Sequence, residues 1–145
     1  MITLAILEQM AEDGVAGLTI DRDLFWEEAP LQKDGNPAQG VWLVTRGSYI
    51  ANNPHGINQH STVDFYVAFN DKTKTETVLR QIQEWLRDNP GICELSGAVG
   101  DSRYSYKNIR IRATTTPSNQ GVTGNGVIVK NASAEIYYDL DEITN

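Results

Sequence analysis

Apolar side chains recur at helical spacing in two parts of the chain. The first is the segment 2–12, whose apolar side consists of Ile6, Leu7, Met10 and Ala11. The second is the segment 75–89, whose apolar side consists of Val78, Leu79, Ile82, Trp85 and Leu86. At 100° per residue these positions form stripes that can cover a core, which predicts two amphipathic helices. Thr73 and Glu76 have the spacing of a capping box at the start of the longer helix, and Pro90 ends it.

Alternating apolar and polar residues predict strands over most of the remaining chain. The alternation is clearest in residues 61–70, STVDFYVAFN. Residues 24–28 and 41–47 predict the two arms of a hairpin with a long loop rich in Pro and Gly. Three more strands are predicted in the last third, at 91–100, 106–114 and 126–140. We expect the last two to pair, with the uncharged, Gly-rich segment 114–126 as a flexible loop between them.

The order of the predicted elements is α-β-β-β-α-β-β-β. Runs of strands separated by single helices are typical of an α+β domain. We therefore expect a mostly antiparallel sheet with two helices packed on one face. A chain of 145 residues has the length of one domain, so 1–145 is expected to fold as a single unit.

The charge is negative and unevenly distributed. The chain carries −7 in total, and residues 1–35, with eight acids and two bases, carry −6 of this. An acidic chain is poorly suited to general nucleic-acid binding, because affinity there comes mostly from neutralising phosphates. No apolar run approaches the ~18 residues of a membrane span. The first residues lack the basic start and cleavage site of a signal peptide, so we expect no secretory route.

Groups with obvious chemistry are few. The glycines of 114–126 do not precede a predicted helix, so they cannot form a phosphate cradle. His55 and His60 are expected in an exposed loop, and no cluster of Cys or carboxylates completes a metal site around them. Cys93, the only cysteine, is expected to be a buried apolar thiol. We therefore expect no catalytic residue, no cofactor and no metal.

Basic residues concentrate in one place, together with tyrosines. The cluster consists of Arg103, Tyr104, Tyr106, Lys107, Arg110 and Arg112. Three roles remain open for it: pairing with Glu135 and Asp139 across the sheet, docking on an acidic partner, or contact with nucleic acid.

Acidic and aromatic residues near the start are the other candidates for contacts. Glu27 and Glu28 are adjacent on a predicted strand and point apart, which indicates an edge kept soluble by charge rather than paired general acids. Trp42 is expected to pack in the core or in the hairpin, with a role as an interface anchor left open, and the same holds for Trp26. Long connections are predicted at 30–40, 47–60 and 114–126. Because the sequence offers no reactive groups that these connections could position, we expect them to contact another chain.

The layout resembles the tail terminator proteins of long-tailed bacteriophages, also filed as minor tail or minor capsid proteins. The resemblance covers nearly the whole chain and rests on the order of its elements. These are the N-terminal helix, the segments FWEEAP and GVWLVTRGSY, the strand and helix of STVDFYVAFNDKTKTETVLRQIQEWLRD, and the final AEIYYDL. The resemblance implies a structural virion protein rather than an enzyme, assembled in the bacterial cytoplasm.

The resemblance also implies partners. Such proteins form a ring, typically of six copies, on the head-proximal end of the tail tube. The ring ends tube polymerisation and offers the surface that joins the head. The implied partners are copies of the chain, the tail tube protein and a head-completion or neck protein, with DNA passing through without specific binding. Another neck or head-completion protein is the nearest alternative, and a small ligand-binding α+β module with a pocket between helices and sheet is a more distant one.

A ring of identical subunits needs two different complementary patches on each subunit. The candidate partner-binding residues are Arg103, Arg110, Arg112, Glu27, Glu28 and Trp42. We expect the basic cluster to meet the acidic residues 1–35 of a neighbouring copy. We also expect the net negative charge of the ring to repel DNA that slides through it.

Overall fold

The computed structural model describes residues 2–27, 38–49, 59–99, 102–114, 118–122 and 127–140. The helices are α1 (Ile2–Glu12), the 3-10 helix η1 (Val15–Gly17) and α2 (Lys72–Asp88). The strands are β1 (Leu24–Trp26), β2 (Gly40–Tyr49), β3 (Gln59–Phe69), β4 (Gly91–Val99), β5 (Ser102–Ala113), β6 (Ser118–Val122) and β7 (Ile128–Leu140). These elements confirm the predicted α+β fold.

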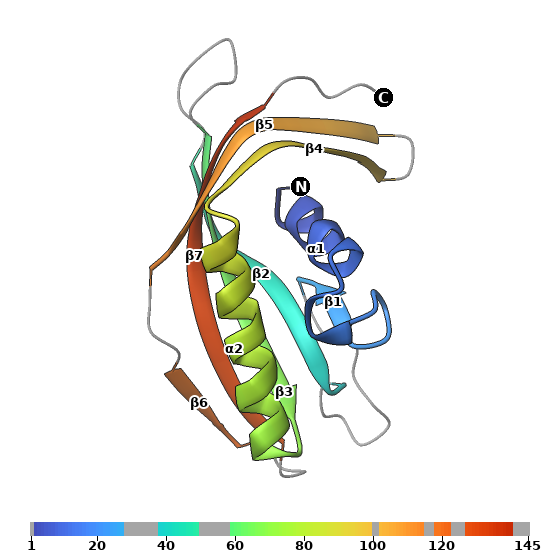
Figure 1. Cartoon of the computed structure of the whole chain (residues 1–145), viewed down its shortest axis with the longest axis vertical. Helices are drawn as coiled ribbons and strands as arrows, with labels where there is room; N and C mark the ends of the chain where they lie inside the picture. Colours follow the sequence, from blue (N-terminus) through green and yellow to red (C-terminus); the bar gives the residue numbers. More distant parts are fainter. Residues whose placement is uncertain are drawn as a thin grey trace.

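One curled sheet contains all the described strands, in the order β1-β2-β3-β7-β5-β4, with β6 also paired to β7. Every pair is antiparallel except β1 with β2. The sheet bends around the helices, and α1 lies inside the bend (Figure 1). We call the face that carries the helices the inner face and the opposite one the outer face.

The core lies between the two helices and the inner face. Its largest fully buried side chains include Phe65 of β3, Ile82 of α2 and Ile6 of α1. α1 packs against β1, β2 and β4, and α2 packs against β7, β3 and β5. The prediction of two helices on one face is confirmed. α1 thus contacts strands from both ends of the strand order.

The pairing of β1 with β2 differs from the predicted hairpin. The two strands run parallel, with Leu24 opposite Val41 and Trp26 opposite Leu43. Alternation along a strand is the same in either direction, so the sequence pattern could not distinguish the two arrangements. Gly40 fixes the junction: its φ is +151°, and a Cβ there would lie 2.6 Å from the backbone oxygen of Asp23.

The predicted loop 114–126 is in part a strand. Ala113 at the end of β5 lies opposite Ala134 of β7, and Ser118 at the start of β6 lies opposite Asn131. β5 and β6 therefore follow one another along the same edge of β7. The pairing of 106–114 with the last strand is confirmed, whereas the prediction of an unbroken flexible loop is wrong for Ser118–Val122. The local sequence, SNQGV, has too little apolar alternation to indicate a strand.

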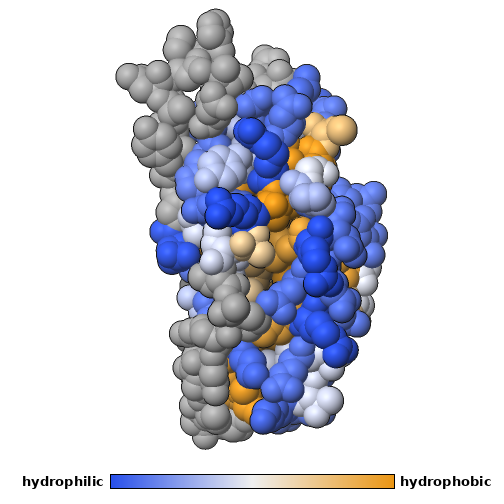
Figure 2. Space-filling view, turned by 60° about the vertical axis from the view of Figure 1, so that its left-hand side comes forward, coloured by the Kyte–Doolittle hydropathy of each residue, from blue (hydrophilic) through white to orange (hydrophobic). Residues whose placement is uncertain are grey.

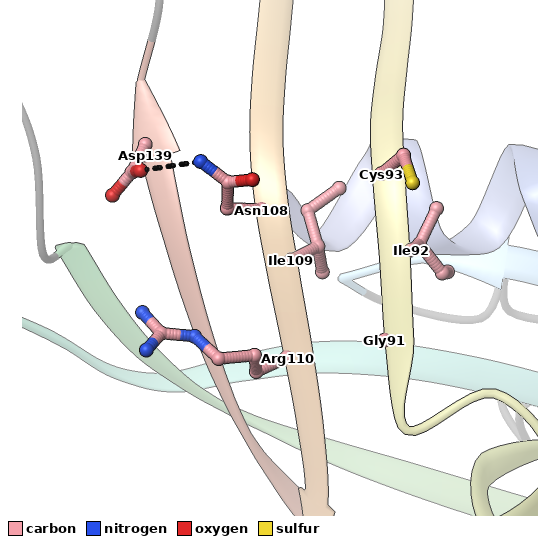
Figure 3. A pocket seen from close by; sticks show the side chains of 7 residues that line it. All are labelled: Gly91, Ile92, Cys93, Asn108, Ile109, Arg110 and Asp139. Carbon is pink, nitrogen blue, oxygen red and sulfur yellow. Dashed lines mark hydrogen bonds between the residues drawn. The ribbon is translucent and has the colours of Figure 1, made fainter.

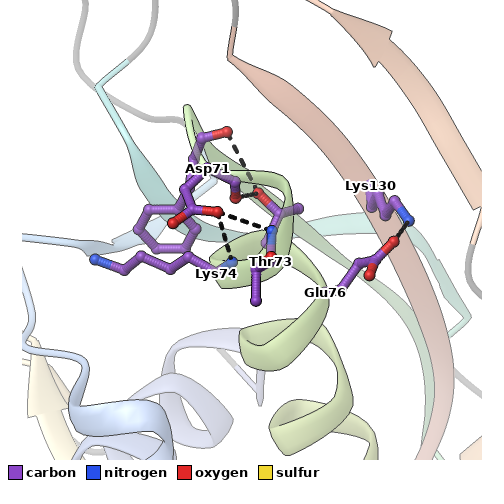
Figure 4. Close-up of polar contacts among 7 residues, drawn as sticks. Asp71, Thr73, Lys74, Glu76 and Lys130 are labelled. Atoms are coloured by element: carbon purple, nitrogen blue, oxygen red, sulfur yellow. Dashed lines mark hydrogen bonds and ion pairs between the residues drawn. The ribbon is translucent and has the colours of Figure 1, made fainter.

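The start of α2 is capped by Asp71 rather than by the predicted box of Thr73 and Glu76. The Asp71 carboxylate accepts hydrogen bonds from the backbone N–H of Thr73 at 2.9 Å and of Lys74 at 3.4 Å (Figure 4). Glu76 instead pairs with Lys130 of β7 at 3.0 Å, which ties the first turn of α2 to the sheet. This hydrogen bond and the charge of Lys130 hold the pKa of the Glu76 carboxyl below its usual value.

The surface in Figure 2 is mostly hydrophilic, and apolar atoms form a narrow band along the length of that face. Within the described segments, no helix has the length and apolar character needed to cross a membrane.

Candidate interaction surfaces

A β-bulge in β5 decides where the basic cluster points. The register against β7 shifts by one residue between Lys107 and Arg110, and Asn108 has a left-handed φ of 52°. Before the shift Tyr106 is buried and Lys107 exposed; after it Ile109 is buried and Arg110 exposed. The bulge therefore brings odd-numbered and even-numbered basic residues to the same outer face.

The predicted neighbours of the basic cluster are confirmed. Glu135 lies opposite Arg112 and Asp139 opposite Lys107, while Tyr137, opposite Arg110, has its ring centre 5.9 Å from the Arg110 guanidinium carbon. Neither Arg110 nor Arg112 forms a salt bridge with a described residue, and the exposed Arg103 forms none either. The three arginines thus keep charge available for a partner.

A shallow hollow of about 620 Å³ lies at the bulge, on the outer face. We call it the bulge hollow; its lining residues are Gly91, Ile92, Cys93, Asn108, Ile109, Arg110 and Asp139. In Figure 3 the Asn108 and Arg110 side chains extend from β5 toward β7, and α1 lies behind the strands. The Asn108 amide nitrogen donates to Asp139 Oδ2 at 2.9 Å, which holds that side of the rim.

Cys93 lines this hollow and is exposed. The prediction of a buried apolar thiol is wrong. β4 is the edge strand of the sheet and bulges outward together with β5, since Ile92 packs against the core and Cys93 does not. Simple alternation from the buried Leu95 would have placed Cys93 inside.

The middle of the outer face carries a polar cluster that the sequence did not reveal. Asp64 of β3, with 6% of its side chain exposed, accepts one bifurcated hydrogen bond from the Arg46 Nε–H, at 3.0 Å to Oδ2 and 3.2 Å to Oδ1. Ser133 of β7 donates a further hydrogen bond to Asp64. The buried carboxylate is therefore satisfied by its neighbours, as a buried charge must be.

His60 belongs to the same face rather than to an exposed loop, which corrects its predicted position. Its ring stacks on that of Tyr137 at 4.5 Å, and Nε2 lies 3.9 Å from Glu135 Oε1. Nε2 is buried without a hydrogen bond to any described atom. His55 lies outside the described residues. Among the residues that are described, no group of three His, Cys, Asp or Glu could hold a metal ion.

Trp42 lies on the outer face of β2 and is half-buried. Its ring stacks on Tyr66 with centres 5.5 Å apart and planes 10° from parallel. Each ring therefore covers one face of the other. Core packing does not describe Trp42, because its side chain lies on the face opposite the helices, and it stacks on Tyr66 of β3 rather than within the predicted hairpin of 24–28 and 41–47.

Glu27 directly follows β1, and its carboxylate is bound within the molecule. Its φ is 69°, and its carboxylate accepts hydrogen bonds from the Thr45 hydroxyl at 2.9 Å and the Thr45 backbone N–H at 3.3 Å. Thr45 Oγ1 also lies 2.6 Å from Thr3 Oγ1 of α1. Glu28 lies outside the described residues, as do most residues of the predicted long loops 30–40 and 47–60. Glu27 thus fastens a strand edge instead of offering a free charge.

The acidic N-terminal region contains an exposed turn at residues 19–24, which we call the acidic turn. The Thr19 backbone oxygen accepts hydrogen bonds from the N–H of Arg22, Asp23 and Leu24. Asp23 Oδ1 in turn accepts from the Thr19 N–H at 2.6 Å. These bonds make the turn rigid. Ile20 and Asp21 are exposed on it, and Asp21 forms no side-chain bond with a described residue.

No protein-family model matches this chain, and no curated protein matches it.

Proposed function

We propose that this protein is a structural virion protein that forms a ring on the head-proximal end of a phage tail tube. In this role it ends tube polymerisation and offers the surface that joins the head. The role needs no catalytic step and no cofactor. Its expected partners are further copies of the chain, the tail tube protein and a head-completion or neck protein.

The observation that carries the proposal is the open sheet. β1 at one end and β4 at the other each pair with a single strand within the described part of the chain. Two different ends on one subunit are what a head-to-tail ring uses, because each contact joins unlike patches. Exposed Arg110 and Arg112 on β5 and the exposed Asp21 near β1 add contrasting charge to these ends.

The layout supports the more specific part of the proposal. The short helix, the strand that runs into a long amphipathic helix, and the final strand pair are the features in which the sequence resembles tail terminators. The tube-capping role rests on that resemblance, while the ring rests on the open sheet.

The test is assembly with the tail tube subunit of the same phage. We expect electron micrographs to show a ring at one end of each tube, and tubes that stop growing once the ring is bound. Monomers that leave tube growth unchanged would contradict the proposal. Binding to a head protein but not to the tube would instead indicate another neck component, and a monomer that binds a small molecule would indicate a ligand-binding module.

A further inference from the structure

The lining of the bulge hollow suits a segment that presents an acidic side chain next to an apolar one. Ile92, which is partly exposed, supplies apolar lining, Ile109 lies beneath it with 1% of its surface exposed, and Gly91 adds no side chain that would fill the space. Arg110 stands at the rim as a cation without a salt bridge to a described residue. A carboxylate that reaches the rim beside an apolar side chain would meet both kinds of lining.

The acidic turn has the matching features. Ile20 is 38% exposed, which makes it one of only two large apolar side chains exposed in the described part of the chain. Asp21 follows it directly, with a φ of 67° that turns the backbone sharply at this point. Because the turn is already fixed by its backbone hydrogen bonds, little conformational entropy is lost when it binds.

We propose that the acidic turn of one copy of this chain docks in the bulge hollow of the next copy. Ile20 then packs on the apolar lining and Asp21 pairs with Arg110. The turn adjoins β1 and the hollow lies on β4 and β5, at the other end of the strand order. The contact is therefore between unlike patches, as a ring requires. This inference rests on the proposed function in one respect, namely that the chain assembles with itself.

A charge exchange tests the pair. Arg110→Asp alone and Asp21→Arg alone should each raise the protein concentration at which half of the chains are assembled by on the order of tenfold. Sedimentation velocity measures this concentration. The two changes in one chain should restore assembly to within about threefold of the wild type, because the pair is rebuilt with opposite polarity. Arg80→Glu on the exposed side of α2 is the matched control, since the one ion pair of Arg80 with a described residue is a distant contact with Glu84 at 3.9 Å.

Cys93 gives a second measurement that needs no substitution. It is the only cysteine of the chain, is exposed and lines the bulge hollow. We expect its reaction with a thiol reagent to be at least about tenfold slower in the assembled ring than in the free subunit, because the neighbour's turn covers it.

The outcomes separate the two proposals. A ring that forms while Cys93 reacts at an unchanged rate, or while the charge exchange restores nothing, overturns the docking of the acidic turn and leaves the proposed function standing. A wild-type chain that stays monomeric with the tube subunit present overturns the proposed function and the docking together.

Discussion

At the scale of single residues, two side chains with unusual backbone angles hold neighbouring strands together. Asn108 and Glu27 both adopt left-handed φ angles, and each uses its side chain to bind an adjacent strand. Asparagine tolerates this conformation better than most residues, whereas glutamate does so rarely. The bulge at Asn108 also determines the direction of Arg110, so one backbone angle decides where charge appears on the outer face.

Substitution of Asn108 should separate its two roles. Asn108→Ala should lower the free energy of unfolding by about 2 kcal/mol, because alanine resists the left-handed conformation and the bond to Asp139 is lost. Asn108→Gly loses only the bond and should cost less than about 1 kcal/mol. Urea unfolding of both variants checks this order. Equal losses would show that backbone strain at the bulge is negligible.

Tyr106 should make the fold sensitive to alkali. Burial, together with the neighbouring Tyr138, raises the pKa of the Tyr106 hydroxyl above its ordinary value. The folded state holds this proton more tightly than the unfolded state. The resulting stability is therefore complete below the unfolded pKa of about 10 and falls as the pH rises above it.

Chemical denaturation at several pH values between about 9 and 11 measures this loss. Tyr106→Phe should show a shallower decline over the same range, whatever its stability at neutral pH. A decline as steep as that of the wild type would show that another group is responsible.

At the scale of elements, the sequence predicted the existence of both helices and of most strands, because their apolar periodicity follows directly from burial. It did not predict the direction of β1 relative to β2, since alternation has no direction. It missed β6 because Ser118–Val122 has little apolar character and is a strand only through its pairing with β7. The interaction surfaces were predicted only in part: the basic cluster was visible, whereas the polar cluster around Asp64 depends on three strands meeting.

The cap of α2 gives a direct comparison of sequence expectation with structure. Asp71→Ala should lower the free energy of unfolding by about 1 kcal/mol, because two N–H groups lose their acceptor. Thr73→Ala should change it by less than about 0.5 kcal/mol, because Thr73 is not the capping residue. Thermal unfolding of the two variants side by side decides between Asp71 and the capping box. The opposite ranking would favour the box.

The junction of β1 and β2 should tolerate no side chain at Gly40. Gly40→Ala places a Cβ against the backbone of Asp23 and should lower the free energy of unfolding by about 2 kcal/mol or more. Gly14→Ala is the control, because Gly14 also has a positive φ but has open space around it. It should cost about 1 kcal/mol. A similar loss for both variants would mean that the close approach at Gly40 relaxes easily.

At the scale of the whole molecule, charge argues against tight binding of duplex DNA. The chain carries −7, which opposes the approach of a phosphate backbone. We expect no retarded band at about 10 μM protein and about 150 mM salt in a gel-shift assay. A stable complex under these conditions would instead point to the basic cluster on β5 as a nucleic-acid surface.

The position of α1 also constrains how the molecule forms. This helix leaves the ribosome before any of the strands, yet one of the strands it packs against, β4, begins only at Gly91. Its apolar side therefore has no complete partner until most of the chain has been synthesised. The helix is made before the strands it packs against, so Ile6, Leu7 and Met10 lack part of their native contacts until β4 has been synthesised.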